Sequence, residues 1–129
     1  MINLERVNNN EDYWEYIRLL RNNDKVSHGF IQKGNITQEQ QKNYMSVHGY
    51  NYFIIKYENN LVGFIGDVEN DMRICIHPDY QNNGYGTQAI IEFNKIYPNS
   101  YAKIKVDNEQ SRRAFEKAGY KIKYFLLEK

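Results

Sequence analysis

Residues 77 to 90, HPDYQNNGYGTQAI, place two glycines one residue apart where polar residues give way to an apolar helix. Glycine adopts backbone conformations that other residues avoid, so Gly84 and Gly86 indicate a tight turn directly before a helix N-terminus. Backbone N–H groups are unpaired at such a terminus, and the helix dipole favours negative charge there. These residue types, at this spacing, therefore predict an anion-binding turn.

Two common phosphate-binding motifs fit this turn poorly. The dinucleotide fingerprint G-x-G-x-x-G has Ala89 at its third glycine here, and the segment lies in mid-chain after a predicted β-meander. A Walker A loop needs a lysine after its last glycine, where this chain has Thr87. A nucleotide-binding regulatory domain is therefore kept only as an alternative.

A second polar segment follows at a set distance. Asn108 lies 24 residues after Gly84 and opens the run NEQSRRAFEKAGYK. The first segment matches the pattern Q/R-x-x-G-x-G/A, and the second matches N-x-x-S-x-x-x-F-x-x-x-G-Y. With this spacing and this order of strands and helices, essentially the whole chain resembles the GCN5-related N-acetyltransferase (GNAT) family.

The resemblance implies a site for acetyl-CoA as the acetyl donor. The pyrophosphate is expected on the backbone of the glycine turn, and the pantetheine arm in a gap between the preceding strand and the strand at 101–106. A main-chain group of Ile74 or Ile76 would hold the acetyl carbonyl as an oxyanion hole, and Arg112, Arg113 or Lys117 would offer charge to the 3′-phosphate. The implied cofactor-binding residues are Ile74, Cys75, Ile76, Gln81, Asn82, Asn83, Gly84, Tyr85, Gly86, Thr87, Asn108 and Ser111.

The catalytic groups depart from the family pattern. Many members have a tyrosine acid seven residues after the asparagine, where this chain has Phe115, and some have a glutamate base where it has Asn70. Asp71, next to Asn70, is the candidate base, although strand alternation places it with Arg73 and Cys75 rather than with Ile74. Tyr120 is the candidate acid. The alternatives are Tyr80 and Tyr101 for the acid, and His77, Asp67 and Glu69 for the base.

The absence of the usual glutamate base affects which kind of acceptor amine is expected. A lysine amine with a pKa of about 10.4 is almost always protonated at neutral pH, whereas an amine with a pKa near or below about 8 needs little help. A small-molecule amine such as an amino sugar is therefore expected as the acceptor. The run IRLLRNNDKVSHGFIQ…ITQEQQ looks like the acceptor side of GNATs that modify aminodideoxy sugar nucleotides, and implies that Arg18, Arg21, His28 and Phe30 line it.

Two alternatives stay open within the resemblance. The acceptor of an acetyltransferase can also be a protein N-terminus or a lysine side chain. Phe115 and Asn70 also suit a non-catalytic acyl-CoA-binding module that has kept the cofactor site and lost the chemistry.

The composition favours a single folded domain over residues 1–129. Apolar residues make up 41% of the chain, and the formal charge of +1 gives no electrostatic reason to expect nucleic acid or an anionic membrane as a partner. The one cysteine, Cys75, excludes an internal disulfide, suits a reducing cytoplasm and is expected in the core rather than as a nucleophile. We expect a cytoplasmic monomer or homodimer without a metal site.

Hydrophobic periodicity predicts the order of the elements. Strands are expected at 2–7, 50–57, 61–68, 72–77, 101–106 and 120–127, and helices at 11–21, after Thr37, at 84–96 and at 108–118. The fold class is then α/β, a mixed and mostly antiparallel sheet that splays at the cofactor site and is flanked by about four helices.

Overall fold

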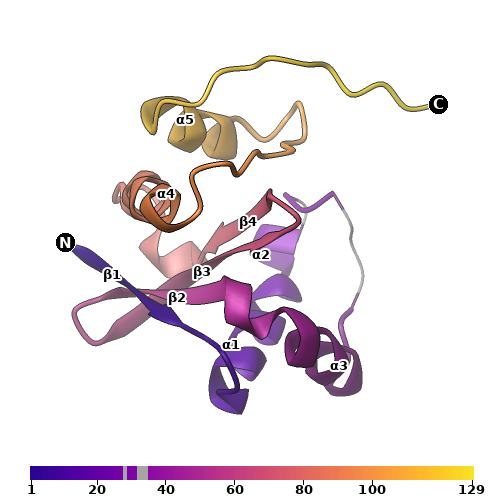
Figure 1. Ribbon diagram of the computed structural model, residues 1–129, viewed down its shortest axis with the longest axis vertical. Coiled ribbons are helices and arrows are strands. Elements are labelled where there is room, and N and C mark those ends of the chain that lie inside the picture. The colour runs from indigo at the N-terminus through magenta and orange to yellow at the C-terminus, as the bar shows by residue number, and fades with distance from the viewer. Residues whose placement is uncertain (28, 32–34) are drawn as a thin grey trace.

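The computed structural model describes residues 1–27, 29–31 and 35–129. Four antiparallel strands form its sheet, in the order in which they occur in the chain (Figure 1). The strands are β1 (Ile2–Arg6), β2 (Tyr52–Tyr57), β3 (Asn60–Val68) and β4 (Asp71–Ile76). The helices are α1 (Glu11–Arg21), α2 (Asp24–Ser27), α3 (Gln38–His48), α4 (Tyr85–Ile96) and α5 (Glu109–Lys117), with short 3-10 turns at Gly49–Asn51 and Pro78–Tyr80.

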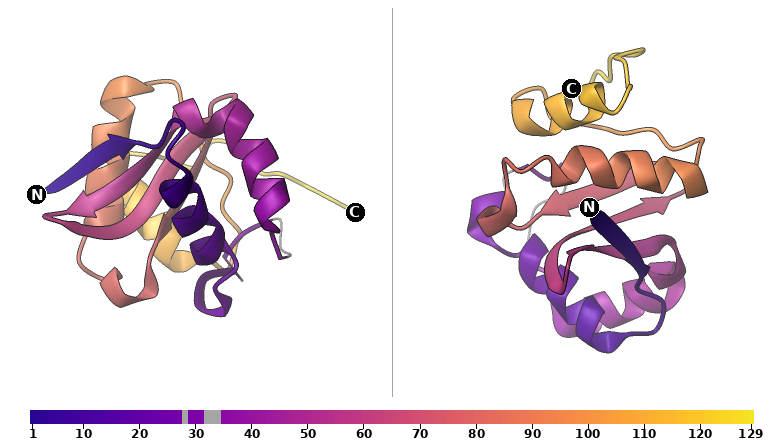
Figure 2. Two further views of the ribbon diagram at one scale, coloured as in Figure 1. Left: turned by 90° about the horizontal axis from the view of Figure 1, so that it is seen from below. Right: turned by 90° about the vertical axis from the view of Figure 1, so that its left-hand side faces the viewer.

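The helices lie on both sides of the sheet, with α1, α2 and α3 on one side and α4 and α5 on the other (Figures 1 and 2). Alternation along β2 explains the two layers, because successive side chains point to opposite faces. Phe53 packs with Phe93 of α4 in one core cluster, and Ile54 packs with Trp14 and Ile17 of α1 in the other. The two cores hold the sheet between the two groups of helices.

Side-chain caps define the starts of several helices. The Asn10 side chain accepts from the backbone N–H of Tyr13 at the start of α1. Thr37 and Gln40 form a capping box at the start of α3, with both reciprocal hydrogen bonds present. These bonds satisfy N–H groups that have no partner within their helix.

The predicted strand at 101–106 shrinks to one parallel bridge. Tyr101 pairs with Asp71, and the chain then leaves β4 without further strand pairing. The predicted mixed and mostly antiparallel sheet that splays beside the glycine turn, flanked by helices, is therefore confirmed. The splay leaves the outer edge of β4 open along residues 73–76.

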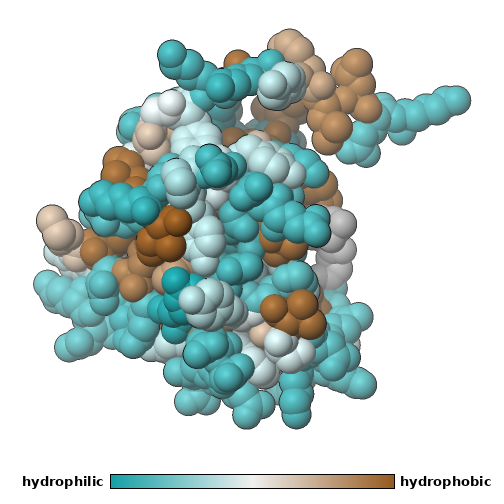
Figure 3. Space-filling view, viewed as in Figure 1, coloured by the Kyte–Doolittle hydropathy of each residue, from teal (hydrophilic) through white to brown (hydrophobic). Residues whose placement is uncertain are grey.

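The predicted strand at 120–127 is wrong for this structure. That segment runs past α5 without strand pairing, and it exposes Tyr124, Phe125 and Leu127 by 89%, 87% and 89% (Figures 1 and 3). The sequence has strand propensity, but a strand also needs a neighbouring edge, and the sheet of the described residues ends at β4 and Tyr101.

Candidate active site

The glycine turn becomes the N-terminus of α4. Gly84 has a φ of +77° and Asn82 a φ of +66°, so the chain passes twice through the left-handed region before the helix begins. The Asn83 side chain donates to the carbonyls of residues 80 and 81 and holds the turn together. Within the described residues, no side chain caps α4 at Gly84, so its first N–H groups lack a side-chain acceptor there, as an anion-binding terminus requires.

The open edge of β4 lies beside this turn. The Met72 N–H donates to the Tyr101 carbonyl at 2.8 Å, so its main-chain groups point away from β3. Alternation then directs the main-chain groups of Ile74 and Ile76 to the same edge. The Ile76 carbonyl accepts from the Gln81 side-chain amide at 3.1 Å, whereas the N–H groups of Ile74 and Ile76 face the gap left by the splay.

A cavity of about 530 Å³ joins the turn, the open edge and α5 to the end of α1 and to α2. Eleven of the twelve predicted cofactor-binding residues line it, and only Asn83 does not. Arg113 and Lys117, two of the cations expected near the 3′-phosphate, line it as well. Residues of the glycine turn and of the segment that begins at Asn108 thus line one cavity.

The two polar atoms of the Asn108 side chain have different surroundings. Its side-chain oxygen caps α5 by accepting from the Ser111 N–H at 3.2 Å. Its amide nitrogen points the other way, because a Cβ added to Gly29 would lie 3.0 Å from that atom. The segment after α2 therefore reaches α5 across the cavity, at a point where only a glycine fits without displacing a neighbour.

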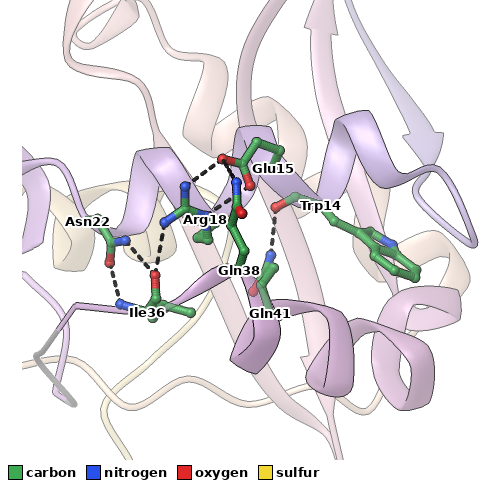
Figure 4. Close-up of polar contacts among 7 residues, drawn as sticks. All are labelled: Trp14, Glu15, Arg18, Asn22, Ile36, Gln38 and Gln41. Carbon is green, nitrogen blue, oxygen red and sulfur yellow. Dashed lines mark hydrogen bonds and ion pairs between the residues drawn. The ribbon is translucent and has the colours of Figure 1, made fainter.

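The predicted acceptor side is only partly assembled. Arg21 and Phe30 line the cavity, and the Arg21 guanidinium lies 4.9 Å from the centre of the Phe30 ring. His28 lies outside the described residues. Arg18 does not line the cavity, because it pairs with Glu15 and donates to the Ile36 carbonyl, which fixes α1 to the start of α3 (Figure 4).

The connection from α1 to α3 is held by further polar contacts. The Asn22 side chain accepts from the Ile36 N–H and donates to the Ile36 carbonyl, both at 2.9 Å. The buried Gln41 of α3 donates to the Trp14 carbonyl at 2.7 Å (Figure 4). The end of α1, and with it Arg21, is thereby fixed in place.

Of the two catalytic candidates, only Asp71 faces the cavity. One of its carboxylate oxygens lies 3.4 Å from Arg73 and 3.9 Å from Lys103. The Tyr120 hydroxyl lies outside the lining, where it accepts from Asn94 at 2.8 Å and donates to the Ser100 carbonyl at 3.3 Å. Burial raises the pKa of Tyr120 and the Asn94 hydrogen bond opposes this, so the phenol is protonated near neutral pH.

The alternative candidates also differ in position. Tyr80 and Phe115 line the cavity, whereas Tyr101 lies at the parallel bridge outside the lining. Asp67 is 4% exposed and accepts from Ser100 and from the Asn70 N–H, so it braces the turn between β3 and β4. His77 accepts from the backbone N–H of residue 79. Among these groups, Tyr80 is the hydroxyl that the structure brings to the cavity.

Cys75 is expected to resist alkylation in the folded protein at about pH 8. Burial raises the pKa of its thiol to about 12, with the charge of Arg21 opposing, and the thiolate is the reactive form. Labelling by iodoacetamide should be at least about 100-fold slower than in the chain unfolded in guanidinium chloride. The unfolded thiol loses its proton first, so this group also lowers stability as pH rises above about 8.5. Equal labelling rates would show that the thiol is accessible.

The cavity also has lining residues that were not predicted as site residues, among them four polar residues or glycines that bear on the acceptor side. Gly29 and Lys25 lie near the end of α2, and no local pattern marks them. Arg73 shares a strand face with Asp71 and Cys75, an alternation visible in the sequence that could have placed it on the acceptor side. Lys103 reaches Asp71 because it lies two residues after Tyr101, which forms the parallel bridge to Asp71.

Comparison with known proteins identifies the family. The family model described as the acetyltransferase (GNAT) family matches residues 10–120. The chain belongs to the GNAT family. No curated protein matches it in sequence. As a GNAT protein, it is an N-acetyltransferase whose acetyl donor is acetyl-CoA, which agrees with the cavity between the glycine turn and the splayed edge of β4.

Solved structures share the GNAT fold at low sequence identity. A spermidine N-acetyltransferase from Vibrio cholerae, in complex with CoA and spermine, is 16% identical, with a TM-score of 0.81 over 99% of this chain and 85% of that one. An acetyltransferase from Bacillus anthracis is 22% identical, with a TM-score of 0.71 over 92% and 78%. The aminoglycoside acetyltransferase AAC(6')-Ib, in complex with coenzyme A, is 11% identical, with a TM-score of 0.74 over 94% and 84%.

In the part of the chain that the structure describes, every helix is too short or too polar to cross a lipid bilayer.

Proposed function

We propose that this GNAT protein acetylates the primary amine of a small molecule, such as an amino sugar, by direct attack on the thioester of acetyl-CoA. The observation that carries the proposal is the single cavity that runs from the uncapped α4 terminus, past the open edge of β4, to Arg21 and Phe30. A donor at one end and an acceptor at the other would then meet beside β4.

On the donor side, the backbone of the glycine turn would hold the pyrophosphate, and Asn108 and Ser111 would face the cofactor arm. The N–H of Ile74 or Ile76 would donate to the acetyl oxygen, where negative charge develops as the amine attacks. The amine nitrogen bonds to the carbonyl carbon, the carbon–sulfur bond breaks, and the thiolate leaves with the electron pair. The amine loses one proton, and the thiolate takes one up.

Geometry distinguishes between the candidate groups for the two proton transfers. Asp71 is the proposed base, because it is the one of the base candidates whose side chain lines the cavity, where it lies beside Arg73 and Lys103. Tyr80 is a better placed acid than Tyr120, because it lines the cavity. A thiolate of pKa about 8.5 leaves without strong acid assistance, so the reaction depends little on this group.

A small acceptor suits the cavity better than a peptide. The segment at 29–31 approaches Asn108 so closely that an added Cβ at Gly29 would lie 3.0 Å from its amide nitrogen. This contact brings the segment after α2 against the start of α5 at the wall of the cavity. Two proteins of the same fold carry names that state small amine acceptors, spermidine and aminoglycosides, which supports the same class here.

Release of free CoA tests the proposal. The protein is incubated with acetyl-CoA and, in separate reactions, with amino sugars, polyamines, a lysine peptide and a peptide with a free N-terminus. We expect CoA release with a small amine, faster than with either peptide. A faster reaction with a peptide would overturn the small-molecule assignment. Thermal protection by acetyl-CoA without CoA release from any amine would identify a non-catalytic binding module instead.

A further inference from the structure

The cavity wall formed by α1, α2 and β4 is rich in cations. Arg21 ends α1, Lys25 lies in α2, Arg73 lies in β4, and Lys103 follows the parallel bridge. Among the described residues that line the whole cavity, Asp71 is the one acidic group. The two cations of α5 face the donor side, where the phosphates of CoA would balance them. On the acceptor wall, the single carboxylate of Asp71 faces four cations, and of these it contacts only Arg73 and Lys103.

Arg21 is the cation of this wall that has a buried hydrogen-bond donor without a partner within the described chain. Its Nε is buried and has no hydrogen-bond partner among the described residues, and none of their carboxylates lies within ion-pair distance of its guanidinium. A buried donor without a partner destabilises the folded protein, and more so when it is charged. Arg18, one turn earlier in α1, is fully engaged by Glu15 and Ile36 (Figure 4). The contrast indicates that the partner of Arg21 is not part of the described chain.

Arg73 extends the charge of Arg21 across the same face of the sheet. It alternates in β4 with Ile74 and so shares a face with Cys75, which packs in the core cluster of α1 and α2. The charges of both arginines reach the buried Tyr52 hydroxyl, where each opposes the rise in its pKa that burial causes. The one carboxylate near Arg73 is Asp71, which Lys103 shares. Two guanidinium groups in one region repel each other unless an anion lies between them.

We propose that the acceptor is an amine that also carries an anionic group, a phosphate or a carboxylate, and that Arg21 and Arg73 bind this group. The inference rests on the proposed function of the same cavity. Arginine suits the role because its planar fork of donors matches the oxygens of both anions. Phe30, over which Arg21 lies, keeps the guanidinium oriented toward the cavity.

The charge of the wall also selects among amines. A polyamine brings several positive charges into a region that already holds excess positive charge, so it binds poorly. An anionic amine neutralises the arginines with one end and presents its amine with the other. The remaining positive potential favours the neutral form of that amine, which is the form that attacks. The wall thereby supplies part of the assistance that a strong general base would give.

A binding experiment tests the anion site without turnover. Thermal unfolding is measured with CoA present at saturation, so that the donor side is filled, and then with inorganic pyrophosphate or citrate added. We expect a further rise in Tm with at least one probe, and its loss in Arg21→Gln and Arg73→Gln. Arg18→Gln, which removes the same charge one turn away, should keep the rise. No further rise with either probe, or an equal rise in Arg21→Gln, would overturn the proposal.

A turnover experiment tests whether the enzyme prefers an amine with an anionic group over one without. CoA release is compared for glucosamine and glucosamine 6-phosphate, and for glycinamide and glycine as the carboxylate pair. We expect the anionic member of a pair to have a KM about 10- to 100-fold lower, and Arg21→Gln to erase this difference with little change in kcat. Equal KM values within both pairs would overturn the anionic class and leave the proposed acetyl transfer intact. Failure of every amine to release CoA would overturn the acetyl transfer, and the binding experiment would still decide the anion site.

Discussion

Replacing Gly84 with glutamate is expected to abolish acetyl-CoA binding. At Gly84 the backbone has a φ of +77°, so any side chain strains the turn, and a carboxylate adds negative charge where the pyrophosphate is expected. With acetyl-CoA at about 100-fold above its Kd, the wild-type protein should gain about 2.7 kcal/mol of stability. This corresponds to a rise in Tm of several degrees for a domain of this size. Gly84→Glu should show no rise.

Gly119→Glu is the matched control. Gly119 also has a positive φ, of +100°, but it follows α5 and does not line the cavity. The same substitution there imposes a similar backbone strain, so both variants should unfold at a lower temperature than the wild type without ligand. Gly119→Glu should keep the rise with acetyl-CoA. If Gly84→Glu kept it as well, the donor would not bind at the glycine turn.

Replacing Ile74 or Ile76 with proline is expected to remove the oxyanion hole. The N–H groups of both residues point to the open edge of β4, so proline deletes a donor without deleting a bond to β3. Loss of one oxyanion-hole donor typically lowers kcat about 10²–10³-fold. We therefore expect a loss of this size in at least one of the two variants, measured as CoA release under saturating substrates.

The alanine variants at the same positions provide the control. Ile74→Ala and Ile76→Ala remove the same apolar side chains from the core but keep the N–H groups. The difference in kcat between the proline and alanine variants at one position then measures the contribution of the N–H group to catalysis, provided that Tm values show both variants folded. Equal kcat values within both pairs would mean that neither N–H group stabilises the transition state.

Local signals explain why much of the donor site could be predicted from the sequence. Gly84 marks a left-handed turn, Asn108 caps α5, and Thr37 with Gln40 forms a capping box, and each depends on neighbours within a few residues. The alternation in β4 likewise determines which main-chain groups face the splay. The predicted elements up to α5 therefore agree with the structure to within about two residues, apart from the strand at 101–106.

Tertiary contacts explain what could not be predicted. Strand propensity at 120–127 does not show whether a sheet edge lies beside it, and none does among the described residues. Arg18 and Arg21 look alike in the sequence, yet one is bound by Glu15 and the other faces the cavity. The approach of Gly29 to Asn108 joins segments far apart in the chain. Each depends on the packing of α1 and α2 against the rest of the fold.

The most direct test of the donor site is a titration of the isotopically labelled protein with acetyl-CoA, followed by the backbone amide resonances. The central claim is that the donor binds along the α4 terminus and the open edge of β4. We predict that the largest shift changes occur at the N–H groups of Tyr85, Gly86, Thr87 and Ile74. Shift changes confined to another surface, or none at saturation, would contradict the claim.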